Sequence, residues 1–196
     1  VLRRAHWARQ KNAGLDIMPC GDFSFYDQML DMITTLGAVP ARYRGEGLDA
    51  PFARYFAMAR GTTGAEDELS VPAMEMTKWF DTNYHYIVPE FRADTMFSLS
   101  GRKVFDEFAE AKALGLNAKP VLIGPVTYLS LGKAQDSENP DFDPFSLLDN
   151  LLEIYGSIIA ELAAEGAEWV QLDEPIFSMD LSEQQLDMCD SSRWDF

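Results

Sequence analysis

The chain has 196 residues, 47% of them hydrophobic and 24% charged, the balance of a globular protein with one sizeable core. Its formal net charge of -16 makes nucleic acid and membrane surfaces poor partners, because both carry negative charge. No apolar run approaches the roughly 20 residues of a membrane span. The two cysteines, Cys20 and Cys189, support no disulfide framework and are typical of a protein in the reducing cytosol.

The first part of the chain is predicted to alternate between helix and strand. Residues 2–13 are expected to form a helix, because Gly14 suits a C-terminal cap. A short buried strand is expected over 15–19. The following helix has apolar residues at helical spacing up to Leu36, and Asp22 is predicted to be its N-cap.

The middle of the chain is less regular. Residues 38–70 are rich in Gly, Pro and charge, which predicts a long loop with a short helix near 51–59. A further extended region is expected over 75–88. A helix is predicted over about 101–114, before Gly115.

The last two units have the clearest patterns. Residues 120–123 have the length and apolar character of a buried strand. Asp143 and Pro144 are predicted to open a long helix as N-cap and first residue. Residues 169–172 read as the next strand. Ser182 and Gln185 have the spacing of a capping box for a last helix, which would include Cys189.

Strands that alternate with helices predict an α/β fold with a parallel sheet. No glycine-rich phosphate loop follows any strand, which argues against a dinucleotide or P-loop fold. Polar residues, namely Asp22, Thr127 and Asp173-Glu174, follow several strand ends, as in a (βα)8 barrel. Such a barrel typically needs about 250 residues, and only four or five strands are counted here. The chain is therefore expected to be an incomplete barrel over 1–196.

The segment 75–86 has the densest chemistry, because it interleaves aromatic and polar residues. It could be a ligand wall, with aromatics for a flat ring and Lys78, Asn83 and His85 for polar or anionic groups. It could equally be a half-buried strand whose aromatics belong to the core. Spacing alone leaves both interpretations open.

Asp173 and Glu174 place two carboxylates at a strand end. They could act as acid and base, as metal ligands, or as partners of buried cations. Adjacent residues on a strand point to opposite faces, so both reach a barrel mouth only if the chain turns at Pro175. Two cysteines and two histidines far apart in sequence make no zinc pattern.

With these motifs the sequence resembles the amino-terminal barrel of the cobalamin-independent methionine synthase family. Three runs are very specific: Met76-Thr77-Lys78-Trp79-Phe80, Asn83-Tyr84-His85-Tyr86 and Val88-Pro89-Glu90-Phe91. The matching stretches are residues 11–16, 21–23, 39–42, 75–91, 119–133 and 168–175. Val1 is not an initiator methionine and 191–196 does not continue the pattern, which departs after about Asp180, so we expect a chain cut at both ends.

The resemblance implies methyl transfer from a 5-methyltetrahydrofolate polyglutamate to homocysteine, giving methionine. It implies two barrels, with zinc held by cysteine, histidine and glutamate in the carboxyl-terminal barrel, which this chain lacks. The present chain would then help to hold the folate and its glutamate tail, contain no catalytic residue or metal ligand, and be inactive alone. Lys78 matches the folate-contacting lysine. Asp22, Asn83, His85, Asp173 and Glu174 match family positions without an assigned role.

Three other functions are compatible with the residues. A glycoside hydrolase barrel would use Glu75 and Glu174 as paired carboxylates. A non-enzymatic module would bind an anionic ligand without chemistry. A related barrel such as a uroporphyrinogen decarboxylase would need arginines for several carboxylates.

Overall fold

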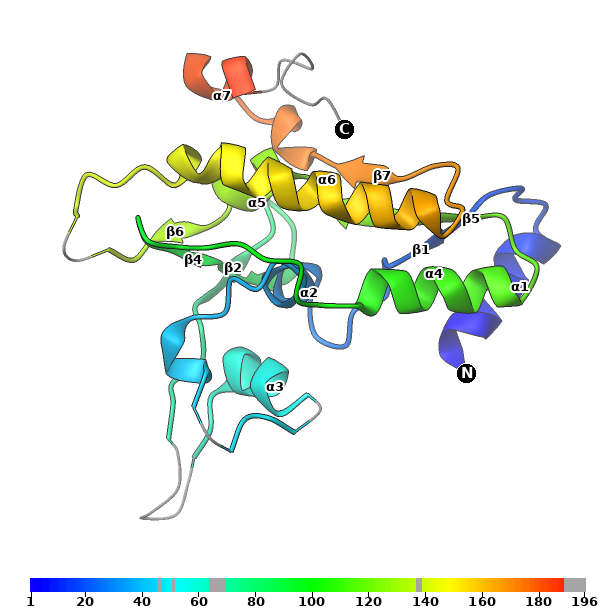
Figure 1. The fold of residues 1–196 in the computed structure, drawn as a ribbon, viewed down its shortest axis with the longest axis horizontal. Coiled ribbons are helices and arrows are strands. Elements are labelled where there is room, and N and C mark those ends of the chain that lie inside the picture. The colour runs from blue at the N-terminus through cyan, green and yellow to red at the C-terminus, as the bar shows by residue number, and fades with distance from the viewer. Residues whose placement is uncertain (46, 51, 64–69, 137–138, 189–196) are drawn as a thin grey trace.

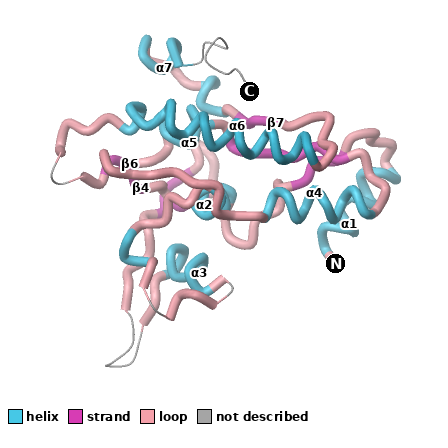
Figure 2. The backbone as a smooth tube through the Cα atoms, in the orientation of Figure 1, coloured by secondary structure: helices cyan, strands magenta, loops and turns pink. Residues whose placement is uncertain are grey.

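The computed structural model describes residues 1–45, 47–50, 52–63, 70–136 and 139–188. It is an α/β structure with three small sheets (Figure 1). Figure 2 shows that long connections separate the short strands, especially between α2 (Gln28–Thr35) and α4 (Lys103–Ala113).

The largest sheet has three parallel strands in the order β1 (Met18–Cys20), β5 (Ala118–Ile123) and β7 (Gln171–Asp173). Pro19 pairs with Lys119, and Leu122 pairs with Leu172. Helix α4 leads into β5, and α6 (Leu148–Ala164) precedes β7. The predicted parallel sheet with helical connections is therefore confirmed for these strands.

The two other sheets are pairs of short strands. Strands β2 (Met76–Lys78) and β3 (His85–Ile87) form an antiparallel hairpin. Strands β4 (Glu90–Phe91) and β6 (Lys133–Ala134) pair in parallel. The remaining elements are α1 (Leu2–Asn12), α3 (Ala53–Arg60), α5 (Pro125–Ser130), α7 (Glu183–Met188) and the 3-10 helices η1 (Ala41–Tyr43), η2 (Pro144–Leu147) and η3 (Pro175–Ser178).

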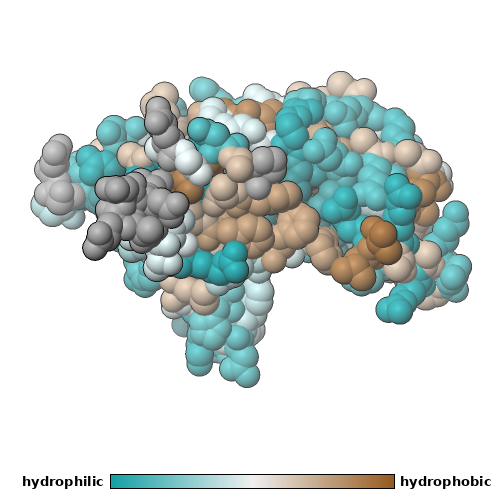
Figure 3. All heavy atoms as spheres, turned by 90° about the horizontal axis from the view of Figure 1, so that it is seen from below, coloured by the Kyte–Doolittle hydropathy of each residue, from teal (hydrophilic) through white to brown (hydrophobic). Residues whose placement is uncertain are grey.

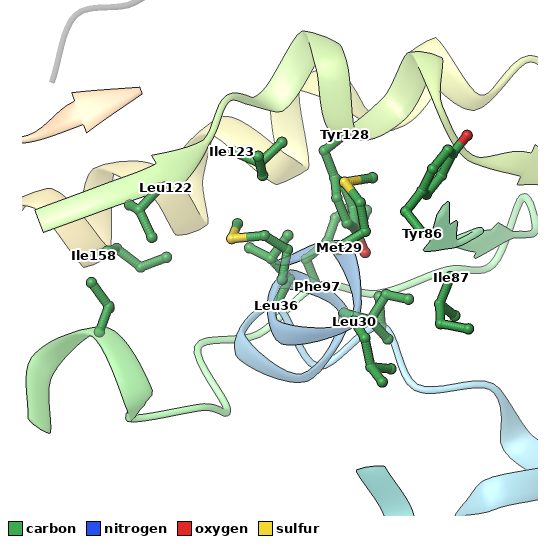
Figure 4. Packing of buried hydrophobic residues seen from close by; sticks show 14 of the residues in the cluster. Met29, Leu30, Leu36, Tyr86, Ile87, Phe97, Leu122, Ile123, Tyr128 and Ile158 are labelled. Carbon is green, nitrogen blue, oxygen red and sulfur yellow. The ribbon is translucent and has the colours of Figure 1, made fainter. Parts of the chain in front are cut away.

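Helix α2 lies at the centre of the core. Figure 4 shows it between the hairpin on one side and β5 with α5 on the other. Its residues Met29, Leu30 and Ile33 are fully buried. Burial of such side chains is worth about 1.5–3 kcal/mol each, which makes this packing a main source of stability. Outside the core, Figure 3 shows apolar side chains gathered near the middle of one face, with hydrophilic residues over much of the rest.

Two sequence predictions about α2 and the strand before it are wrong. The N-cap of α2 is Asp27, not Asp22, because the Asp27 carboxylate accepts hydrogen bonds from the backbone N–H groups of Met29 and Leu30. The strand expected over 15–19 lies at Met18–Cys20, after the exposed Leu15 and Ile17.

Later in the chain the structure differs at three further places. The extended region expected over 75–88 is a hairpin, since the chain reverses between β2 and β3. Helix α5 begins directly after β5, where no helix was predicted. Trp169, placed in a strand by its sequence, is 62% exposed and precedes β7.

Other predictions are confirmed. Helices α1 and α4 end before glycines with positive φ, Gly14 and Gly115. Ser182 and Gln185 form the predicted capping box, each side chain accepting from the other residue's backbone N–H. Cys189 and residues 191–196 lie outside the described residues. None of the helices in the described part combines the length and apolar character needed to cross a membrane.

Candidate functional site

A small cavity of about 60 Å³ lies where the carboxyl ends of β1, β5 and β7 meet α2 and the start of α4. Asp22, after β1, and Asp173, at the end of β7, both line it. The carboxyl ends of parallel strands share one edge of a sheet, which brings these residues together although 151 positions separate them. Two of the residues predicted from sequence therefore lie at one site.

Lys103 is a central charged group of this cavity. Its ammonium lies 3.3 Å from Asp31 and 3.1 Å from Glu107, and it donates to the Gly21 carbonyl at 3.1 Å. Glu107 is buried and also accepts from the Gly21 backbone N–H. These interactions neutralise the lysine and fix the loop that carries Asp22. Sequence reasoning missed this group, for which the only signal was the Lys103–Glu107 spacing of four residues.

Glu174 is turned away from the cavity that Asp173 lines. Its carboxylate accepts from the backbone N–H groups of Val126 at 2.9 Å and Thr127 at 2.6 Å, at the start of α5. Burial raises the pKa of Glu174, whereas these hydrogen bonds act in the opposite direction. The adjacent carboxylates thus have different surroundings, as the alternation of side chains along a strand predicts.

The β2–β3 hairpin presents Lys78 and His85 side by side. The two residues pair directly across the strands, so their side chains lie on the same face, and both are exposed. Asn83 lies in the turn, and its carbonyl oxygen is 3.0 Å from Nδ1 of His85. Lys78, Asn83 and His85 therefore form one exposed polar group.

Aromatic side chains of the same hairpin form a cluster next to this polar group. The Trp79 ring contacts Phe80, Tyr84 and Tyr86, with centroid distances of 5.3, 6.3 and 5.6 Å. Tyr86 is buried, whereas Trp79 is half-buried. The aromatics of this segment therefore belong partly to the core, as one interpretation predicted, and a role in ligand binding stays a prediction.

The hairpin is attached to the helix that lines the cavity. The Tyr84 hydroxyl accepts from the backbone N–H of Gln28 at 3.3 Å, and Gln28 also lines the cavity. The buried Asp27 carboxylate accepts from the Ile87 backbone N–H at 3.2 Å. The start of α2 therefore connects the Lys78 group to the Asp22–Asp173 cavity.

The described residues do not fit a zinc centre. They contain no group of three or more His, Cys, Asp or Glu placed to hold a metal ion. Burial raises the pKa of the Cys20 thiol to about 12, so it stays protonated at neutral pH, whereas zinc binds the thiolate.

The chain was compared with known proteins. A family model described as "Cobalamin-independent synthase, N-terminal domain" matches residues 1–192, and so continues past Asp180, where the sequence was expected to leave the pattern. A protein of Salinibacter ruber, named 5-methyltetrahydropteroyltriglutamate--homocysteine methyltransferase, is 53% identical over 188 residues, covering 94% of this chain and 24% of the relative.

Two further relatives carry the same name. The protein of Nitrobacter winogradskyi is 50% identical over 195 residues, 93% of this chain and 25% of the relative. That of Streptomyces coelicolor is 51% identical over 185 residues, 94% of this chain and 23% of the relative. The chain therefore spans about a quarter of the length of the curated relatives it matches.

Proposed function

Because the chain belongs to the cobalamin-independent synthase family and matches its amino-terminal domain, we propose that it serves a methionine-forming methyltransferase. The substrates would be those named for the relatives, 5-methyltetrahydropteroyltriglutamate and homocysteine. In this proposal the enzyme works in the cytosol, and the chain is part of a (βα)8 barrel. The parallel β1-β5-β7 sheet and the polar groups at its carboxyl edge support the barrel.

The chain's own role would be to bind the anionic glutamate tail through Lys78. The exposed Lys78 and His85 pair on the hairpin is the observation that carries this role. A tail that approaches a chain of net charge -16 needs a local cation. The aromatic cluster around Trp79 supports the hairpin that carries the lysine.

The methyl transfer itself would take place in a second, carboxyl-terminal barrel. Zinc bound there would supply a homocysteine thiolate at neutral pH by lowering the pKa of the thiol. The described residues of this chain offer no such ligand set, so the chain alone would bind folate without turnover. For the isolated chain, this proposal therefore agrees with the alternative of a non-enzymatic module that binds an anion.

The two carboxylates that a glycoside hydrolase would use, Glu75 and Glu174, each have other partners in this structure. Glu75 is exposed and forms an ion pair with Lys133. Glu174 accepts backbone hydrogen bonds at the start of α5. The two carboxylates thus have separate partners, and the family match supports the methyltransferase over the glycoside hydrolase.

Replacement of Lys78 tests the proposal in the full-length enzyme. Lys78→Met should raise KM for the triglutamate substrate several-fold and change kcat less, because the reacting atoms lie in the other barrel. The effect should shrink for the monoglutamate and weaken in high salt. Lys11→Met, which removes an exposed lysine of α1, is the matched control. Unchanged KM values in Lys78→Met for both substrates would show that Lys78 is only a solvated side chain.

A further inference from the structure

A second and larger concavity lies apart from the cavity at the strand ends. It has a volume of about 960 Å³ and runs between the loop that follows α2 and the segment that precedes α4. We call it the arginine groove, because four arginines line it: Arg42, Arg44, Arg54 and Arg92. Neither Lys78 nor His85 lines it.

The arginines of this groove differ in whether they have an acidic partner. Arg42 pairs with Glu90, and Arg92 pairs with Asp94 and lies 3.9 Å from Asp136. Arg54 pairs with the exposed Asp49. Arg44 is the arginine of the groove that forms no ion pair among the described residues.

The arginines also differ in how many of their N–H groups are bonded within the protein. Arg42 forms a two-pronged pair with Glu90, at 2.6 Å for both bonds, and is fixed as part of the wall. Arg44 donates through Nε to the Val39 carbonyl at 2.9 Å. Its two Nη groups have no hydrogen-bond or ion-pair partner among the described residues, although the side chain is exposed and oriented by the Nε bond.

Arg54 is held in a similar way. Its Nε donates to the Tyr43 carbonyl at 3.0 Å, and one Nη lies 3.1 Å from the exposed Asp49. A guanidinium fixed through Nε presents its Nη edge in a defined direction, which suits carboxylate and phosphate oxygens. Arg44 and Arg54 are therefore oriented donors in the groove.

The other side of the groove supplies small polar groups. Ser98 and Ser100 line it, with their hydroxyl oxygens 2.8 Å apart. A side chain at Gly37 would meet these hydroxyls, since a Cβ there would lie 2.4 Å from Oγ of Ser98. The glycine thus leaves room for both hydroxyls, which belong to exposed residues of the groove.

We propose that the arginine groove is a binding site for a small anion with two or more carboxylate or phosphate groups. Arg44 and Arg54 hold the charged groups, and the Ser98 and Ser100 hydroxyls donate further hydrogen bonds. This site is separate from the Lys78 hairpin, and it does not depend on the methyltransferase function.

Isothermal titration of the full-length protein in low salt with citrate, and separately with inorganic tripolyphosphate, tests the proposal. We expect saturable binding of one anion per chain. Arg44→Gln should weaken it about tenfold, the loss of one charge-assisted contact, and Arg54→Gln should weaken it comparably. Stronger binding of citrate identifies a polycarboxylate site, and stronger binding of tripolyphosphate identifies a phosphate site.

A control variant makes the test specific. Arg9→Gln removes the same charge from the exposed end of α1 and should leave binding unchanged. Circular dichroism must show that each variant is folded. The proposal is wrong if neither anion binds, or if Arg9→Gln weakens binding as much as Arg44→Gln.

Discussion

Glu174 keeps its position because residue 124 has no side chain. A Cβ at Gly124 would lie 2.2 Å from the carboxyl carbon of Glu174. We expect Gly124→Ala to lower the free energy of unfolding by about 2 kcal/mol, because the displaced carboxylate loses its bonds to Val126 and Thr127. Urea denaturation measures this change.

A double-mutant cycle shows whether Glu174 is the cause. The backbone of Gly124 has φ -72°, which alanine adopts without strain. Once Glu174→Ala has removed the carboxylate, Gly124→Ala should therefore cost little. Fully additive losses would mean that the clash involves another group.

Asp27 makes stability depend on pH at one residue. Burial raises its pKa from 3.8 to about 6, because the folded protein disfavours the ionised form. The folded state therefore binds a proton more tightly, and this stabilising contribution is full below about pH 4 and is lost as pH rises to about 6. Relative to Asp27→Asn, the wild type should lose stability over this range and level off above it. A difference that is flat from pH 4 to 7 would contradict this assignment.

The role of a single residue could be predicted where it depends on bonds between neighbours in sequence. It could not be predicted where it depends on contacts between distant segments. The Ser182–Gln185 capping box was identified because its bonds join neighbouring residues. Asp22 and Asp27 both precede α2, but the helix begins at Gln28, which makes Asp27 its N-cap, and the Asp27 carboxylate also accepts from the Ile87 backbone N–H. The different orientations of Asp173 and Glu174 follow from strand geometry, but the capping of α5 by Glu174 depends on a contact 48 residues away.

The β2–β3 hairpin is attached to α2 by side-chain hydrogen bonds, one of them accepted by the Tyr84 hydroxyl. Tyr84→Phe removes the hydroxyl that accepts from Gln28 and retains the ring that contacts Trp79. We expect a loss of about 1 kcal/mol in stability, because the Lys78 strand becomes less firmly attached to α2. The proposed binding of the triglutamate in the full-length enzyme should weaken for the same reason. Tyr26→Phe, a half-buried tyrosine outside the hairpin, is a control. An unchanged KM in Tyr84→Phe would show that substrate binding does not depend on this attachment of the hairpin to α2.

Elements were predicted well where they are long and periodic. Helices α4 and α6 follow their apolar spacing and end before glycines. The hairpin was not predicted because its turn, Asp81-Thr82-Asn83, contains no glycine, and Phe80 adopts the positive φ of 50° instead. Helix α5 was missed because its six residues are too few to show a helical period.

At the scale of the whole molecule, the alternation of strands and helices predicted the parallel sheet, since the pattern repeats along the chain. The cavity at the carboxyl edge followed from the same topology. The arginine groove did not, because Arg42, Arg44, Arg54 and Arg92 come from three separate segments and show no common spacing. Sites made by folding distant loops together leave no local pattern in a single sequence.

The net charge of -16 gives a last prediction for the whole molecule. Like charges repel one another more strongly in the compact state than in the expanded chain, which lowers stability at low ionic strength. An increase from about 10 to 150 mM NaCl shortens the screening length from roughly 30 to 8 Å and should therefore raise the urea midpoint. The exposed ion pairs, such as Arg102 with Glu161, are weakened by the same salt but are worth little each. Sodium chloride is preferable to sulfate, which also strengthens apolar burial. A midpoint that falls with salt would show that the paired charges outweigh the overall repulsion.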